Sequence, residues 1–120
     1  MANNISTSLK HLMEIDGAMG SCIVDYGSGM SLGSVGAGVD LDLAAAGNSE
    51  VVKAKMKTMK SLGIKGEIED ILITLNSQFH IIRPTAKHSG LFIYLVLDKN
   101  KANLALARRS VLAVEAILEV

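Results

Sequence analysis

Apolar residues recur at helical spacing in the middle of the chain, over Asp40 to Gly63 (DLDLAAAGNSEVVKAKMKTMKSLG). Asp40 and Asp42 are residue types that cap helix N-termini, and Gly63 suits the position just after a last turn. The pattern therefore predicts one helix of roughly 20 residues, about 30 Å long. This helix is the longest regular element that the sequence predicts.

The apolar arc of this helix is wider than a helix on a single sheet needs. Its central stripe consists of Leu41, Ala44, Ala45, Val52, Met56, Met59 and Leu62. The arc continues on one side through Leu43, Gly47, Val51, Ala54 and Thr58. The hydrophilic face is limited to Ser49, Glu50, Lys53, Lys57 and Lys60. The surplus, rich in Ala and Gly, predicts a second packing surface, for which the same helix of a second copy is a candidate.

Asn48 and Lys55 fall inside the apolar arc, and two interpretations stay open for them. Polar residues at such positions can set the register of a helix pair. Alternatively, Lys55 lays its aliphatic stem on the surface and keeps its amine in water.

Shorter patterns predict two further helices and five strands. The helices are Ile5 to about Ile15, capped by Asn4 or Ser6, and a last helix capped by Asp98 or Asn100, with the buried stripe Leu104, Ala107, Val111, Val114 and Leu118. The strands are 18–25, 30–36, 68–75, 78–83 and 90–97, of which the second is rich in Gly and Ser and therefore an expected edge. The turn at 25–29 and the other short joins predict antiparallel hairpins. The unbroken apolar run of the last strand indicates a central strand with helices on both faces.

Composition and charge restrict the class of protein. The chain has 120 residues, so we expect a single domain over 1–120. Lys+Arg and Asp+Glu balance at 12 each and aromatics make up 3%, which leaves neither a basic footprint nor stacking platforms for nucleic acid. A single cysteine, Cys22, argues for a reducing compartment. The N-terminal segment lacks a signal-peptide pattern, and the longest apolar run, Leu91 to Leu97, is too short to span a bilayer, so we expect a cytoplasmic protein without membrane insertion.

The glycine-rich and acidic segments carry no recognisable cofactor motif. Two G-x-G pairs, at 27–29 and 36–38, lack the third glycine of a dinucleotide loop, because Leu32 and Leu41 stand there. Asp40 and Asp42 provide too few ligands for a cation, so helix capping is their expected role. The acidic residues just before the third strand have no nearby base or nucleophile and are expected to be a solvated strand start; they are Glu67, Glu69 and Asp70.

The histidines and the cysteine do not form a metal or nucleophile pattern either. His11, His80 and His88 are not spaced like zinc ligands, with one another or with Cys22. We expect His80 on the less buried face of its strand and Cys22 as a small buried apolar residue. Arg108 and Arg109 can meet a phosphate or a carboxylate, although a solvated helix face explains them as well or better. The sequence thus predicts no catalytic residues, no metal and no cofactor, and therefore no enzyme.

The third strand offers a surface instead. Ile71, Ile73 and Leu75 alternate with Leu72 and Thr74, so both of its faces are largely apolar. If this strand is an open edge, it invites pairing with another chain. An edge strand directly after an over-apolar helix predicts an isologous dimer, with strand against strand and helix against helix.

Four segments together give the chain a resemblance to a known family. They are IDGAMGSCIVDYGSGMSLG (15–33), LDLAAAGNSEVVKAKM (41–56), EDILITLNSQFHIIRP (69–84) and GLFIYLVLDKNKANLALAR (90–108). The I-D-G-A start, the D-x-x-S-G-x-x-L hairpin and the strand ending L-V-L-D are typical of the Roadblock/dynein light-chain family. The chain resembles in particular its small single-domain bacterial members, over nearly its whole length.

The resemblance implies an α+β, profilin-like fold: a five-stranded antiparallel sheet, with one helix on one face and two on the other. It also implies a homodimer in which central helices and third strands pair. Carried onto this chain, the dimer positions are Ala44, Asn48, Val51, Lys55, Met59, Ile71 and Ile73.

Family members act as non-catalytic partners of Ras-like small GTPases or as subunits of larger assemblies. The first hypothesis is therefore a homodimeric regulator of a small GTPase, with Lys53, Lys57 and Lys60 as candidate contacts. The alternative is a constitutive structural subunit or scaffold. A third hypothesis, an enzyme or small-molecule sensor, has little support in the sequence.

Overall fold

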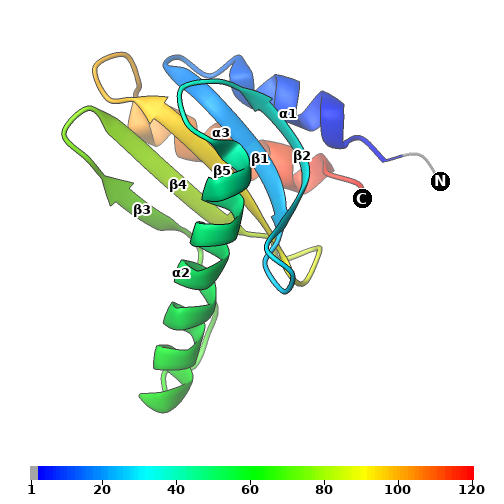
Figure 1. The fold of residues 1–120 in the computed structure, drawn as a ribbon, viewed down its shortest axis with the longest axis vertical. Coiled ribbons are helices and arrows are strands. Elements are labelled where there is room, and N and C mark those ends of the chain that lie inside the picture. The colour runs from blue at the N-terminus through cyan, green and yellow to red at the C-terminus, as the bar shows by residue number, and fades with distance from the viewer. Residues whose placement is uncertain (1–2) are drawn as a thin grey trace.

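Three helices and five strands make up residues 3–120, the part of the chain that the computed structural model describes (Figure 1). In chain order they are α1 (Ile5–Met13), β1 (Ala18–Asp25), β2 (Met30–Gly36), α2 (Leu41–Ser61), β3 (Ile71–Thr74), β4 (Gln78–Pro84), β5 (Leu91–Asp98) and α3 (Leu104–Ile117). The strands form one antiparallel sheet in the order β2-β1-β5-β4-β3. The expected element order and the α+β class are confirmed.

The helices cover the two faces of the sheet, and each face has its own apolar core. In Figure 1, α2 lies in front of the sheet, whereas α1 and α3 lie behind it. One core joins α1 and α3 to residues such as Ile23, Ile93 and Leu95, and the other joins α2 to residues such as Cys22, Val24 and Phe92. Residues of β5 alternate between the two cores, as its unbroken apolar run predicted for a central strand.

The local signals for α2 act as predicted. The Asp40 side chain accepts a hydrogen bond from the backbone N–H of Leu43 at 3.1 Å, which satisfies one of the free donors of the first turn. Gly63 follows the last turn with a φ of 70°, a conformation that costs glycine little. The turn between β1 and β2 places Gly29 at a φ of 80°. The helix thus begins after Asp40 and ends before Gly63, and the hairpin turns at Gly29.

Three predicted elements have other bounds in the structure. The third strand is only Ile71–Thr74, because the carbonyl of Glu69 bonds to the Arg83 side chain and Leu75 lies in the turn to Gln78. Asp98 and Asn100 form a turn of their own, and Asn103 caps α3 by accepting from Leu106. α1 ends at Met13 rather than Ile15, with Asn4 at its N-cap position. The Asn4 side chain makes no cap hydrogen bond and instead holds the C-terminal segment through Glu119 and Ile117.

Ser49 does not lie on the face of α2 that its polarity predicts. The hydrophilic face is wrong for this residue, because Ser49 is buried against the sheet. Its hydroxyl donates to the carbonyl of Ala45 at 2.6 Å, one turn earlier. A serine that satisfies itself on its own helix can occupy a buried position, so polarity alone gives the wrong face.

Candidate interaction surface

The sheet-facing side of α2 is narrow, and the rest of its apolar arc is open to solvent. Leu41, Ala45 and Val52 are buried beneath the helix. Leu43 and Leu62, in contrast, expose 70% and 66% of their surface. The helix packs on β1 and β2, and its C-terminal part projects beyond the edge of the sheet (Figure 1). The surplus apolar arc predicted from the sequence therefore has no cover within one described chain.

The predicted dimer positions on α2 lie along one flank of the helix. Ala44, Asn48 and Met59 are half-buried, whereas Val51 and Lys55 are exposed. This flank is turned toward β4 and β3, since Asn48 approaches the hydroxyl of Tyr94 in the central strand. The side of α2 that carries Lys55 is thus the side nearer to β4 and β3.

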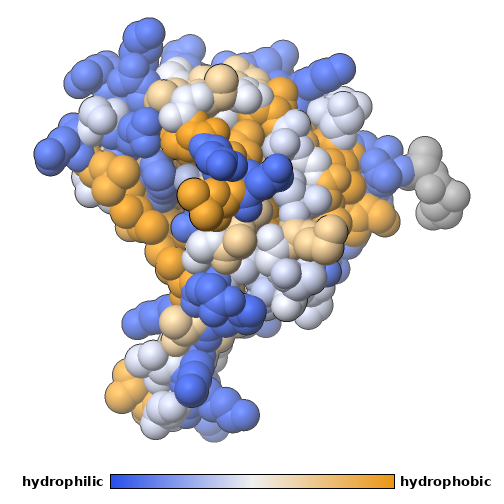
Figure 2. Space-filling view, viewed as in Figure 1, coloured by the Kyte–Doolittle hydropathy of each residue, from blue (hydrophilic) through white to orange (hydrophobic). Residues whose placement is uncertain are grey.

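The third strand forms the edge of the sheet next to this flank. Within residues 3–120, β3 pairs with β4 alone, so its outer edge is free. Ile71 and Ile73 belong to the core on the α2 face and are only half-buried. Figure 2 shows hydrophobic surface running along β3 on this face. The structure therefore brings the predicted helix and strand positions to one face, which we call the α2–β3 surface: Ala44, Asn48, Val51, Lys55, Met59, Ile71 and Ile73.

A polar network lies between α2 and the edge strand, and the sequence analysis missed it. The Tyr94 hydroxyl is 2.9 Å from His80 Nδ1, and His80 Nε2 is 2.9 Å from Gln78 Oε1. These distances fit a neutral imidazole that accepts from Tyr94 and donates to Gln78. His80 lies opposite Ile73 of β3, so the network is next to the edge. Gln78 and His80 are two residues apart in one strand, so the sequence shows that they share a face. Tyr94 comes from another strand and reaches them only because of the strand order.

Burial shifts the pKa of both ionisable groups of this network. It lowers the pKa of His80 below its usual value, because the charged imidazolium would lose water. Burial likewise raises the pKa of Tyr94, and the nearby Asn48 amide acts in the opposite direction. Both side chains are therefore neutral near pH 7. His80 itself is half-buried, but its face of β4 is not the less buried one, because Ile82 on the same face is fully buried in the core beneath α2.

The candidate partner-binding lysines are distributed around the hydrophilic side of α2. Lys53 is half-buried and pairs with Glu50 at 3.2 Å, whereas Lys57 and Lys60 are exposed. Lys60 also lines a cavity of about 670 Å³ beneath the projecting end of the helix. Met56, Met59 and Arg83 contribute to the same cavity. Lys60 thus lies next to a hollow, which the spacing of the lysines alone did not reveal.

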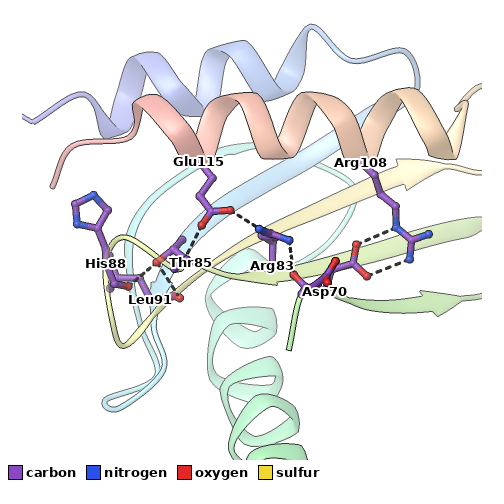
Figure 3. Close-up of polar contacts among 9 residues, drawn as sticks. Asp70, Arg83, Thr85, His88, Leu91, Arg108 and Glu115 are labelled. Atoms are coloured by element: carbon purple, nitrogen blue, oxygen red, sulfur yellow. Dashed lines mark hydrogen bonds and ion pairs between the residues drawn. The ribbon is translucent and has the colours of Figure 1, made fainter. Parts of the chain in front are cut away.

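Two ionic contacts from α3, of which one is buried, hold the start of β3 in place (Figure 3). Arg83 bonds to Glu115 at 2.6 Å and to the carbonyl of Glu69 at 2.8 Å. Arg108 binds Asp70 through two hydrogen bonds of 2.9 and 3.0 Å. Of the interpretations left open for Arg108, contact with a carboxylate is the one that the structure shows. Asp70 is half-buried in this pair, so the expectation of a solvated residue is wrong for it. These partners are 32 and 38 residues apart in the chain, so no local pattern could pair them.

Two of the features tested in the sequence, a metal cluster and the Cys22 thiol, can be examined directly in the described residues. Between residues 3 and 120, no three His, Cys, Asp or Glu side chains lie close enough to hold a metal ion. Burial, with a smaller contribution from the Asp42 carboxylate, raises the pKa of the Cys22 thiol to about 12. A thiol in that state is a poor nucleophile. Within the same range, no helix is long and apolar enough to cross a membrane.

Solved structures share this architecture over most of the chain. A Roadblock/LC7 domain from Streptomyces avermitilis aligns with a TM-score of 0.79 at 13% identity, covering 92% of this chain and 90% of that one. MglB from Myxococcus xanthus aligns with a TM-score of 0.82 at 16% identity, covering 94% and 89%. The chain has the Roadblock-type fold. A gliding protein, MglB from Thermus thermophilus, aligns with a TM-score of 0.73 at 16% identity and the same coverage.

The Roadblock-type fold is thus established by structure rather than by sequence. Neither the protein-family models nor the curated protein sequences give a match to this chain. The resemblance drawn from the four sequence segments is borne out at the level of the fold, including one helix on one face and two on the other.

Proposed function

We propose that this protein is a non-catalytic homodimeric regulator of a Ras-like small GTPase, which modulates GTP hydrolysis or nucleotide state by binding in the cytoplasm. The α2–β3 surface carries this proposal. On one face of a Roadblock-type fold, a helix flank with exposed Val51 and Lys55 lies beside the free outer edge of β3. The family that the sequence resembles supplies the class of partner.

The dimer that we propose follows from the chemistry of this surface. The outer edge of β3 has free N–H and C=O groups within one described chain, and pairing with a second β3 satisfies them. The same two-fold operation brings the two α2 flanks together. Asn48 and Lys55 then lie at or beside the helix seam, where polar groups can fix register.

The dimer leaves the hydrophilic side of α2 available to a partner. Lys53, Lys57 and Lys60 are the contacts that we assign to it. Exposed cations mainly accelerate encounter with an acidic surface and lose their effect as salt is added. The cavity beside Lys60 gives the partner a shaped place to bind next to these charges.

Capture from the native lysate tests this function. The protein is used as bait once with GDP and once with a non-hydrolysable GTP analogue. We expect one small GTPase to be retained in only one nucleotide state. The double variant Lys57→Glu with Lys60→Glu should weaken its capture, whereas Lys101→Glu, which reverses an exposed lysine outside α2, should not. If the lysine variant binds the GTPase with the same affinity as wild type, these lysines are not contacts.

A constitutive scaffold is the alternative function, and one observation favours it. Leu43 and Leu62 are large apolar residues that are mostly exposed, and permanent interfaces are more hydrophobic than transient ones. The scaffold uses the same dimer but binds its partner without regard to nucleotide. A partner retained equally with GDP and with the GTP analogue would therefore support the scaffold and contradict the regulator.

A further inference from the structure

The strand β2 is the second edge of the sheet. Within residues 3–120 it pairs with β1 alone, and it lies at the opposite end of the strand order from β3. It therefore has no part in the α2–β3 surface. Its sequence, MSLGSVG, contains neither a charged residue nor a proline, which are residue types that usually protect an edge from other strands.

A bulge protects only the first half of this edge. The register between β1 and β2 shifts between Ile23 and Val24, so Leu32 has no partner in β1. An extra residue of this kind bends the strand and interrupts its pairing. From Gly33 to Gly36 the register with β1 is regular. This second half of β2 is therefore the part of the edge to which another strand can be added.

The backbone groups that face outward in this half follow from the pairing with β1. Residues opposite each other in antiparallel strands alternate between hydrogen-bonded and non-hydrogen-bonded pairs. The N–H of Ala37 donates to the carbonyl of Met19 at 2.9 Å, so these two residues are a hydrogen-bonded pair. The next pair, Gly20 and Gly36, is then a non-hydrogen-bonded pair. Two residues further on, the exposed Ser34 likewise turns its N–H and C=O away from β1.

A groove lies along this edge, on the side of α1. It has a volume of about 370 Å³, and α1 packs beside β2 (Figure 1). Gly33 permits this close packing, because a Cβ at its position would lie 2.8 Å from Ile5 Cγ2. The apolar residues that line the groove come from both elements and are Ile5, Leu9, Leu32 and Val35. An apolar side chain of an added strand can thus be buried between α1 and β2.

The charge of the groove indicates what binds there. Lys10 lines the groove, and no ion pair within residues 3–120 includes this lysine. None of the described residues that line the groove is acidic, so an acidic side chain beside Lys10 is favoured in the bound segment. A second copy of β2 has no such residue and would bring a second Lys10 toward the first. The charge therefore favours a segment of a different protein.

We propose that the β2 edge binds an extended segment of a partner protein as an additional strand, with an apolar side chain in the groove and an acidic residue beside Lys10. The outward N–H and C=O groups of Ser34 and Gly36 bind the main chain of the segment, and the groove selects its side chains. This contact uses the edge opposite β3, so it does not depend on the α2–β3 dimer.

Selection from a display library of random peptides on the wild-type protein tests this binding mode. We expect the enriched peptides to alternate apolar and polar residues and to carry an acidic residue. Each is then synthesised and titrated into isotope-labelled protein, and the NMR signals of the backbone amides show where it binds. The largest shifts should lie in β2 and α1. A selection that enriches no such peptide, or shifts centred on other elements, would overturn the proposal.

A proline substitution tests the main-chain hydrogen bonds. Ser34→Pro removes an outward N–H that β1 does not use, and an edge strand tolerates proline at such a position. We expect it to weaken binding of the selected peptides about tenfold, as for the loss of one hydrogen bond. Ser34→Ala keeps the N–H and should bind like wild type. Circular dichroism verifies that both variants are folded. Peptides that bind the two variants equally well would contradict strand addition.

A charge reversal tests the acidic position of the segment. Lys10→Glu should weaken the selected peptides roughly fivefold, and should bind better those in which lysine replaces the acidic residue. Lys101→Glu, at another exposed lysine, is the matched control and should change neither affinity. Equal effects of the two substitutions would show that only the overall charge matters and that Lys10 is not a contact.

Sedimentation equilibrium without peptide tests whether a second copy occupies the edge instead. We expect Ser34→Pro and Ser34→Ala to assemble exactly as wild type does, whether or not the α2–β3 dimer forms. A largest wild-type species that persists in Ser34→Ala and is lost in Ser34→Pro would place a second copy on β2. That result would overturn the proposal of a partner segment.

Discussion

The thiol of Cys22 lies in β1 within the core beneath α2, fully buried. Burial first, and the Asp42 carboxylate second, raise its pKa from 9.0 to about 12. The folded protein therefore keeps a proton on this sulfur that the unfolded chain releases above about pH 9. The unfolded state is favoured by that release, so Cys22 lowers the stability as the pH rises from about 9 to 12.

Urea unfolding at pH 8 and at pH 10 tests this effect of Cys22. We expect wild type to lose more stability between the two pH values than Cys22→Ala, which has no thiol to ionise. The alanine variant is less stable at pH 8 because it loses packed volume, so the comparison is of the change with pH. Identical changes in the two proteins would show that the thiol ionises freely in the folded state.

His80 has the opposite pH dependence. Its pKa is lowered by burial, so the unfolded chain binds a proton near pH 6 more readily than the folded protein does. Stability should therefore fall as the pH decreases below about 6.5, and His80→Gln should flatten that part of the profile. His11→Gln, at an exposed position, is the control. If His11→Gln flattens the profile as much as His80→Gln, burial of His80 is not the cause.

At the scale of elements, ionic contacts attach α3 to the strands beneath it. Glu115 binds Arg83 of β4 and also accepts from the backbone N–H of Ala86 at 2.7 Å. The Arg83 and Glu115 side chains are only 17% and 8% exposed. Removing one partner from such a pair leaves a charge that neither water nor a counter-ion can stabilise. The loop after β4 and the start of β3 both depend on this pair.

Arg83→Met should destabilise the protein by about 3–5 kcal/mol, since it leaves Glu115 charged and buried. Adding Glu115→Gln should restore part of that loss. Lys87→Met breaks the exposed pair with Glu119 and should cost less than about 1 kcal/mol. Chemical denaturation measures all three. Equal losses for Arg83→Met and Lys87→Met would show that the buried pair adds no more than a surface contact.

Elements with a local signal could be predicted from the sequence, and contacts between distant residues could not. The α2 helix is specified by Asp40, by the apolar spacing and by Gly63, all within one stretch. Arg108 and Asp70 meet only because the fold brings α3 over the start of β3. Ser49 was misplaced because its hydroxyl is satisfied within the helix, which the polarity of a serine does not reveal.

At the scale of the whole molecule, the Roadblock-type fold leaves apolar surface on both outer sides. The α2–β3 surface combines Val51 and its neighbours with the free edge of β3, as the wide arc of the helix and the apolar strand predicted. The exposed apolar residues of α3 (Leu106, Leu112 and Ile117) were missed, because the sequence analysis followed only the buried residues of that helix.

Val51→Glu tests the helix part of the α2–β3 surface. Val51 is exposed in one chain, so the substitution leaves the monomer core unchanged. At a helix seam it brings two carboxylates together, and we expect loss of the dimer or insoluble protein. Light scattering after gel filtration measures the outcome. A soluble dimer of unchanged stability would show that the helix flank is not an interface.

Symmetry makes the strand part of this surface directly testable. If the α2 helices of both copies lie on one face of a continuous sheet, the two-fold axis is perpendicular to that sheet. One residue of β3 then lies opposite its own copy, at a Cα–Cα distance of about 4.5–5.5 Å, which a disulfide can bridge. The regulator and the scaffold both require this arrangement.

The most direct measurement is a scan of single cysteines from Asp70 to Leu75 in a Cys22→Ala background, oxidised and analysed without reductant. We predict that one position gives a disulfide-linked dimer in high yield, with the yield falling at its neighbours. Ser34→Cys, on the opposite edge strand β2, should remain monomeric on the gel. A scan in which no β3 position links faster than Ser34→Cys would contradict the dimer on which the proposed function depends.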